Sequence, residues 1–111
     1  MTKQELYDWW FDSFGACNCG DPAFAAELLR DVLQILSGRD FGLTPEEWEK
    51  TTTLLHDKLP TDGVFWTYLY WLSHLDLEEH GGCTPGWLTG HGDAVLAALQ
   101  EFGTDPNKWC V

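Results

Sequence analysis

Apolar residues recur every three or four positions along most of this chain, and this spacing predicts amphipathic α-helices. The first predicted helix covers residues 3–14, where Leu6, Trp10 and Phe14 form one apolar stripe. The acidic residues of the same segment fall on the opposite side of the helix, which predicts a solvated face. Two aromatic residues lie beside the stripe, Tyr7 and Phe11, and the acidic residues are Glu5, Asp8 and Asp12.

Helix start and stop signals divide the rest of the chain into four further helices. Thr2 with Glu5, and Thr44 with Glu47, have the spacing of a capping box, in which a threonine and a glutamate satisfy each other's backbone N–H groups. Proline opens the second and third helices, and glycine or proline follows each helix end. The four helices are predicted over residues 22–37, 45–59, 62–80 and 91–102. The expected fold is therefore all-α, a compact bundle of about five helices that forms a single domain over residues 1–111.

The fourth predicted helix differs from the others because its first half, VFWTYLYWL, is apolar almost all round. A helix of this kind is typical of the centre of a bundle, where it is covered on several sides. Its second half carries Asp76, Glu78 and Glu79 and is expected to emerge into water. The segment CTPGWLTG that follows is predicted to be a turn-rich connection, and no segment alternates as a strand would.

Charge narrows the classes of partner. The chain has 18 acidic and 6 basic residues and a formal net charge of -12. Such a chain repels phosphate groups, so direct binding to nucleic acid or to an anionic membrane is not expected. The longest apolar run is far short of the roughly 20 residues that span a bilayer, and no secretory leader is visible. We therefore expect a cytoplasmic protein whose partner is a basic protein.

Four cysteines leave three interpretations open. Structural disulfides are not expected in a cytoplasmic chain, and the close pair Cys17 and Cys19 would cramp two bridges. A zinc site is the second interpretation, with His80 and Cys83 completing the ligand set, although a C-x-C pair is tighter than the usual spacing. We favour the third interpretation, in which the thiols are small buried side chains at helix ends.

No catalytic motif accompanies the histidines, so we do not expect an enzyme. Nucleophilic catalysis would need a pocket that pairs Cys19 or Cys83 with one of these histidines. The histidines are His56, His74, His80 and His91.

A partner-binding patch is predicted from acidic residues that local helix physics does not explain. Carboxylates near a helix C-terminus are disfavoured by the helix dipole, and exposed tryptophan beside carboxylates is typical of a binding anchor. The alternatives are a solvated face for the acids and a packing role for the tryptophans. The predicted patch consists of Asp76, Glu78, Glu79, Trp9, Trp87 and Trp109.

Two resemblances can be drawn from short motifs. In WLTGHGDAVLAALQEFGTDP the order of Leu88, Thr89, Gly92 and Leu96 resembles the end of winged-helix regulators, where a strand leads through a threonine cap into a terminal helix. The basic recognition helix of those proteins has no counterpart here. The compact, acidic, tryptophan-rich chain with its CNCGDP turn is similar in style to small proteins of phages that infect actinobacteria. This likeness implies a binding protein directed at a host or a defence system.

The function expected from the sequence is a non-catalytic acidic module that binds, and modulates or inhibits, a host protein. One alternative is a nucleic-acid mimic that occupies a DNA- or RNA-binding protein, which the high negative charge would suit. Another alternative is a regulatory module stabilised by the zinc site named above.

Overall fold

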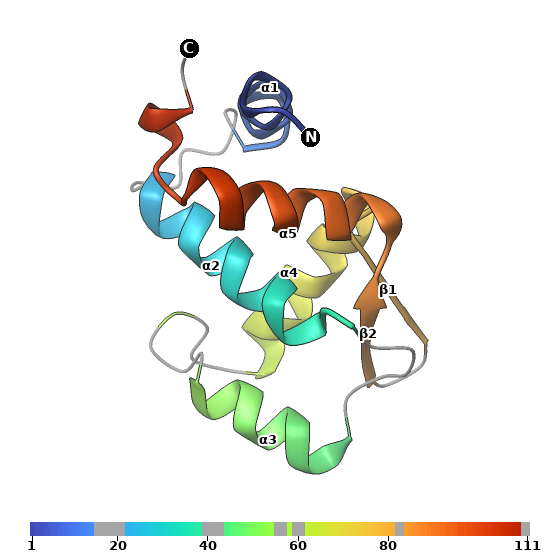
Figure 1. The fold of residues 1–111 in the computed structure, drawn as a ribbon. Coiled ribbons are helices and arrows are strands. Elements are labelled where there is room, and N and C mark those ends of the chain that lie inside the picture. Colours follow the sequence, from blue (N-terminus) through green and yellow to red (C-terminus); the bar gives the residue numbers. More distant parts are fainter. Residues whose placement is uncertain (15–21, 39–43, 55–57, 59–61, 82–83, 110–111) are drawn as a thin grey trace.

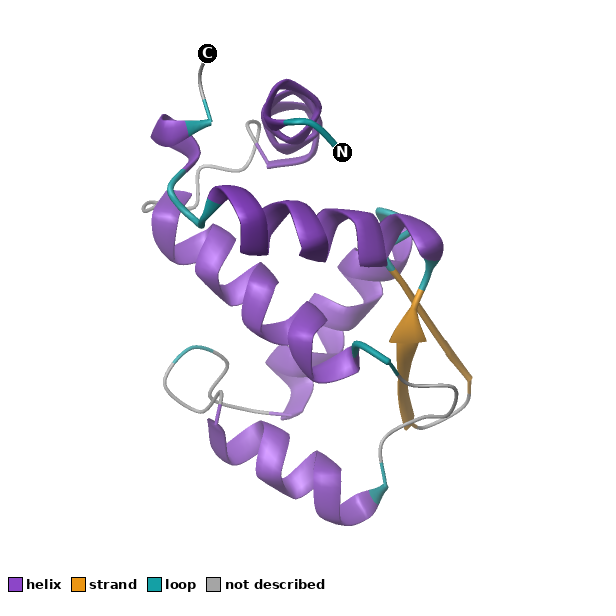
Figure 2. Ribbon diagram, in the orientation of Figure 1, coloured by secondary structure: helices purple, strands orange, loops and turns teal. Residues whose placement is uncertain are grey.

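The structure is a computed structural model, and it describes residues 1–14, 22–38, 44–54, 58, 62–81 and 84–109. These residues form five α-helices, a two-stranded antiparallel hairpin and one turn of 3-10 helix, which confirms the predicted mostly helical fold (Figures 1 and 2). The helices are α1 (Lys3–Phe14), α2 (Pro22–Leu36), α3 (Pro45–Leu54), α4 (Asp62–His74) and α5 (Gly90–Phe102). The strands are β1 (Glu78–Gly81) and β2 (Thr84–Leu88), and the 3-10 turn is η1 (Pro106–Lys108).

Both predicted capping boxes are present. At the start of α1 the backbone N–H of Glu5 donates to Thr2 Oγ1 at 3.1 Å, and the N–H of Thr2 donates to Glu5 Oε1 at 2.9 Å. These hydrogen bonds hold the pKa of the Glu5 carboxyl below its ordinary value. Thr44 and Glu47 exchange the same pair of hydrogen bonds at the start of α3, both at 3.2 Å. The two helix starts therefore follow from residues that lie within one turn of each other.

One hydrophobic cluster holds the helices together. Leu6 and Trp10 bring α1 onto α5 and the C-terminal segment, and α2 and α5 cross at the centre of the molecule (Figure 1). The buried apolar residues are Leu6, Trp10, Ala26, Leu28, Leu29, Val32, Leu33, Leu36, Leu69, Leu72, Leu77, Val95, Leu96, Ala98, Leu99 and Trp109. Among the described residues α2 contributes most to this core, because its apolar positions recur along one whole side of the helix.

The predicted central position of the fourth helix is corrected by this arrangement. Leu69 and Leu72 of α4 are buried, but Tyr70 is 55% exposed and Val64 is 43% exposed. One side of α4 therefore packs on the core while another side faces water, and α2 takes the central place. None of the helices in the described part of the chain combines the length and the apolar character needed to cross a membrane.

The fourth helix also ends earlier than predicted, at His74 rather than near His80. The N–H of Leu77 donates to the carbonyl of Leu72 at 3.0 Å, and the N–H of Asp76 donates to the carbonyl of Ser73 at 3.0 Å. Asp76 has a φ of 61°, so this is a Schellman ending with an aspartate in the left-handed position where glycine is usual. Leu72 and Leu77 are both buried, which supplies the apolar contact that accompanies this ending.

Strands β1 and β2 replace the helix end and the turn-rich connection that the sequence predicts. Glu78 pairs with Leu88 and Glu79 with Trp87, and the register shifts between Glu79 and Gly81. The chain therefore turns back at the end of α4 and runs through β2 directly into α5 (Figure 2).

Candidate protein-binding surface

The predicted acidic patch does not form one exposed surface. Glu78 is only 1% exposed, and its carboxylate accepts a hydrogen bond from the N–H of Gly86 at 3.4 Å. Successive side chains of a strand point to opposite faces, so Glu79 is exposed while Glu78 is turned inward. The assignment of Glu78 to a partner-facing patch is therefore wrong. Asp76 is exposed, but its backbone is committed to the end of α4.

The junction between α4 and α5 explains why these residues serve the fold. Thr89 caps α5, because its Oγ1 accepts from the N–H of Gly92 at 2.9 Å and donates to the carbonyl of Asp76. The N–H of Thr89 also donates to the carbonyl of Leu77 at 3.1 Å. A Cβ atom at position 92 would lie 2.1 Å from the Leu77 carbonyl oxygen, so the start of α5 and the end of α4 meet without room for a side chain.

The three tryptophans of the predicted patch have different surroundings. Trp109 is 0% exposed, its ring packs edge-on against Trp10 at 5.5 Å, and its Nε1–H donates to the carbonyl of Gly103 at 3.1 Å. Its assignment as a binding anchor is wrong, and the alternative packing role is the one observed. Trp9 is half-buried and packs edge-on against His91 at 5.8 Å, and Trp87 is half-buried in β2.

The predicted zinc ligands cannot be placed as a set. Cys17, Cys19 and Cys83 lie outside the described residues, as does the side chain of His80. Within the described part of the chain, no three histidine, cysteine, aspartate or glutamate side chains gather as metal ligands would. The zinc site stays a prediction.

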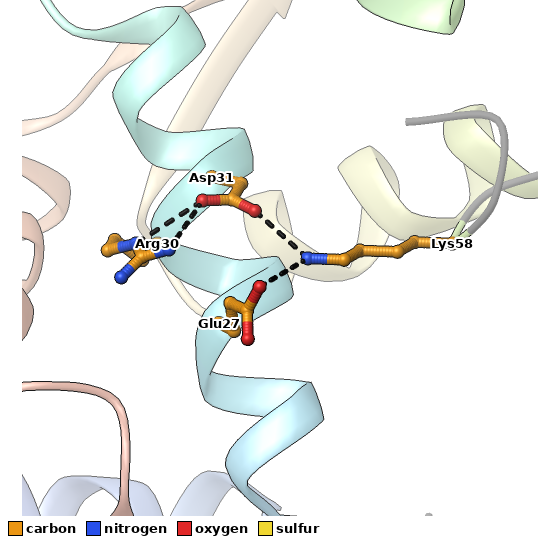
Figure 3. A network of polar contacts seen from close by, with 4 residues as sticks. All are labelled: Glu27, Arg30, Asp31 and Lys58. Atoms are coloured by element: carbon orange, nitrogen blue, oxygen red, sulfur yellow. Dashed lines mark hydrogen bonds and ion pairs between the residues drawn. The ribbon is translucent and has the colours of Figure 1, made fainter. Parts of the chain in front are cut away.

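Two of the cations are engaged inside the protein rather than displayed to a partner. Lys58, in the connection between α3 and α4, reaches across to α2, where its Nζ lies 3.0 Å from both Glu27 Oε1 and Asp31 Oδ2 (Figure 3). Arg30 Nη2 lies 3.0 Å from Asp31 Oδ1. Burial lowers the pKa of Lys58, but its hydrogen bonds with the two carboxylates outweigh burial and hold the pKa above its ordinary value. Lys58 also lies 5.6 Å from the centre of the Phe24 ring.

The outer face of α1 combines an exposed aromatic ring with carboxylates. Phe11 is 62% exposed, the largest exposure of any large apolar residue described. Its ring stacks on Tyr7 with centroids 6.3 Å apart and an interplanar angle of 26°. Asp8 and Asp12 are exposed on the same face, and with Tyr7 and Phe11 they are the described residues that line a hollow of about 350 Å³. We call Tyr7, Asp8, Phe11 and Asp12 the α1 hollow.

The carboxylates of the α1 hollow are not neutralised by the described residues. Asp8 Oδ1 accepts a hydrogen bond from the uncharged amide of Gln4 at 2.9 Å. Asp12 has neither an ion pair nor a side-chain hydrogen bond among the residues that the structure describes. Two carboxylates therefore lie beside an apolar ring without a described cation in contact, which is the chemistry of a site for a cationic group.

The sequence predicts the exposed acids of the α1 hollow but not the exposure of Phe11. The solvated acids of the first helix are correctly predicted, and Phe11 is placed beside the apolar stripe, about 100° around the helix from Trp10. Whether that position is covered depends on how α5 lies against α1, which periodicity does not specify. The clue in the sequence is an aromatic residue that follows one aspartate by three positions and directly precedes another.

Helix α3 lies at the opposite end of the molecule from α1 (Figure 1). A second hollow lies beside α3. Its volume is about 630 Å³, and the described residues that line it are Glu46, Glu49, Lys50 and Thr53. Lys50 follows Glu46 by four positions, a spacing that lets the two charges offset each other. Among the described residues of this lining none is aromatic, which distinguishes them from those of the α1 hollow.

Comparisons of the chain with protein-family models, with curated proteins and with solved structures found no match.

Proposed function

We propose that this protein is a non-catalytic module that binds a basic protein partner through the outer face of α1. The observation that carries the proposal is the exposure of Phe11 beside the carboxylates of Asp8 and Asp12. Covering a solvent-exposed aromatic ring with a partner is favourable, because apolar surface is removed from water. Charges beside the ring select which partner can cover it.

The charge of the whole chain supports the same kind of partner. A net charge of -12 attracts a basic protein over a distance of about one Debye length, roughly 8 Å at physiological salt, and speeds the encounter. Exposed acids are described on α1, α2, α3 and α5, so attraction is general, whereas the ring of Phe11 is local. Charge would bring the partner near, and the α1 hollow would fix where it docks.

Helix α1 uses one side for packing on the core and another side for the α1 hollow. Leu6 and Trp10 fasten α1 to the hydrophobic cluster from one side of the helix, while Phe11 and the aspartates occupy another side. A partner can therefore cover the α1 hollow without displacing core residues. Interfaces of this kind form with little change in the backbone.

The proposal can be tested by affinity capture with two matched variants. The immobilised protein is exposed to a lysate of cells in which it occurs, and retained proteins are identified by mass spectrometry. The test variant carries Asp8→Asn, Phe11→Ala and Asp12→Asn, and the control carries Glu46→Gln and Glu49→Gln, which removes the same number of charges at the other end of the molecule. We expect a basic protein to be retained by the wild type and the control and lost from the test variant.

Equal retention by both variants would show that attraction is only general and would overturn the proposal. Retention should also fall steeply as salt is raised, because surface charges are screened. DNA added as a competitor provides a further outcome: if it displaces the partner, the occupied surface normally holds nucleic acid. That result would support the mimic and inhibitor role that the sequence leaves as an alternative.

A further inference from the structure

We infer that the α1 hollow receives an arginine side chain of the partner, with the guanidinium plane against the ring of Phe11 and its N–H groups directed at Asp8 and Asp12. This inference rests on the proposed function, which it narrows from a basic partner to a specific side chain. It follows from the size, the layout and the charge of the hollow.

The size of the hollow suits one side chain. Its volume of about 350 Å³ is at the lower end of the range for small-ligand sites, roughly 300–1,000 Å³. A single long side chain that enters from a partner surface fills a space of this size.

The layout of the four residues follows from helix geometry. Tyr7 and Phe11 are four positions apart, as are Asp8 and Asp12, so the hollow has an aromatic row and an acidic row beside each other along α1. The stacking of Tyr7 on Phe11 orients the Phe11 ring from one side. A planar cation can then contact the ring with its face while its edge points toward the acidic row.

Arginine meets this layout better than lysine. The guanidinium group is planar, stacks on aromatic rings and presents several N–H donors in one plane, whereas an ammonium group is a compact point charge with a strong hydration shell. Two carboxylates on one side of a ring offer acceptors to more than one N–H group at once. Asp8 holds one oxygen against Gln4, which leaves its charge in place and restricts its rotation.

The inference can be tested with short peptides followed by two-dimensional NMR at low ionic strength. The peptides are acetylated and amidated, consist of glycine and serine, and carry one arginine, lysine, trimethyl-lysine or citrulline. We expect the arginine peptide to shift the amide signals of residues 7–12 and to bind about fivefold more tightly than the lysine peptide, as a cation–aromatic contact of about 1 kcal/mol would give. Citrulline, which keeps the shape without the charge, should not bind measurably.

Two variants separate the aromatic and the acidic contributions. Phe11→Leu keeps an apolar side chain but removes the aromatic face, and it should bring arginine binding down to the lysine level. Asp8→Asn with Asp12→Asn should abolish binding, whereas Glu46→Gln with Glu49→Gln should leave it within a factor of about two. Because all of these side chains are exposed, or in the case of Phe11 mostly exposed, each variant should fold.

Several results would overturn the inference. These are equal affinity for the arginine and lysine peptides, tighter binding of the trimethyl-lysine peptide, or signal changes centred on α3 or the hairpin. Failure here is distinguishable from failure of the proposed function. A captured partner that requires the α1 hollow but keeps binding after its surface arginines become lysines would refute only the inference. Arginine binding at α1 without any captured basic protein would refute only the proposed function.

Discussion

The hairpin junction and the outer face of α1 both carry acidic residues next to aromatic ones, yet they use them in opposite ways. At the junction Glu78 is buried and Asp76 shapes the end of α4, so these acids are tied into the fold. On α1, Asp8 and Asp12 are exposed beside a ring that is 62% exposed. The difference shows that acidity along the sequence does not identify a binding surface. The engagement of each carboxylate inside the protein has to be known as well.

The largest expected effect would come from filling the closest approach at the junction. Gly92→Ala places a methyl group against the Leu77 carbonyl and should lower the free energy of unfolding by about 3 kcal/mol, because backbone has to move. Unfolding in urea or guanidinium measures this change in the free energy of unfolding. Gly90→Ala is the matched control, since nothing lies within 4 Å of its added methyl group, and it should be neutral or stabilising by up to about 1 kcal/mol. Similar losses in both variants would contradict the tight junction.

Removing the bridging hydroxyl should have a smaller effect. Thr89→Ala deletes both the cap on the Gly92 N–H and the hydrogen bond to the Asp76 carbonyl, and should cost about 1–2 kcal/mol. Thr89→Ser retains the hydroxyl and should recover most of this loss. Serine and alanine variants of equal stability would show that the hydroxyl does not join α4 to α5.

A third substitution should stabilise the protein, because it removes a buried hydroxyl group that has no described hydrogen-bond partner. The hydroxyl of Tyr68 is buried and has no hydrogen-bond partner among the described residues, while its ring packs edge-on against Trp71 at 5.8 Å. Burial also raises the pKa of Tyr68 well above its ordinary value. Tyr68→Phe keeps the ring and removes the unsatisfied group, so we expect a gain of about 1 kcal/mol in thermal or denaturant unfolding. A loss of stability would mean that the hydroxyl has a partner in the folded protein.

The smallest change in the free energy of unfolding is expected for a substitution on the outer face of α1, in contrast to those at the junction. Phe11→Ala should change the free energy of unfolding by less than about 0.5 kcal/mol, because surface positions away from the core contribute little. Leu6→Ala, one turn earlier on the buried side, is the internal comparison and should cost about 2–5 kcal/mol. If Phe11→Ala proved equally costly, Phe11 would belong to the core and could not serve a partner.

Features that depend on neighbouring residues are predicted well from this sequence. The capping boxes at Thr2 and Thr44 need only residues three positions apart, and both form as expected. Glycine with a positive φ ends α2 at Gly38 and follows α5 at Gly103, as the stop signals predict. Trp109 is buried against Trp10, as the packing alternative for the tryptophans predicts.

Features that depend on distant contacts are predicted poorly. The ending of α4 is concealed because an aspartate takes the left-handed position, which is usually marked by glycine. Strand β1 contains no β-branched residue, and it is defined by pairing with β2 rather than by its own propensity. The burial of Glu78 and the exposure of Phe11 both depend on which element covers them, so the predicted patch and the observed hollow differ.

The edge-on pair of Trp10 and Trp109 provides an optical probe of this protein. Two indole rings 5.5 Å apart and inclined at 81° are close enough for their electronic transitions to couple, so we expect a paired circular-dichroism signal of opposite signs. Trp10 belongs to the helix that carries the α1 hollow, and Trp109 belongs to the C-terminal segment. The intensity of that signal would therefore report whether α1 stays seated while a ligand occupies its outer face.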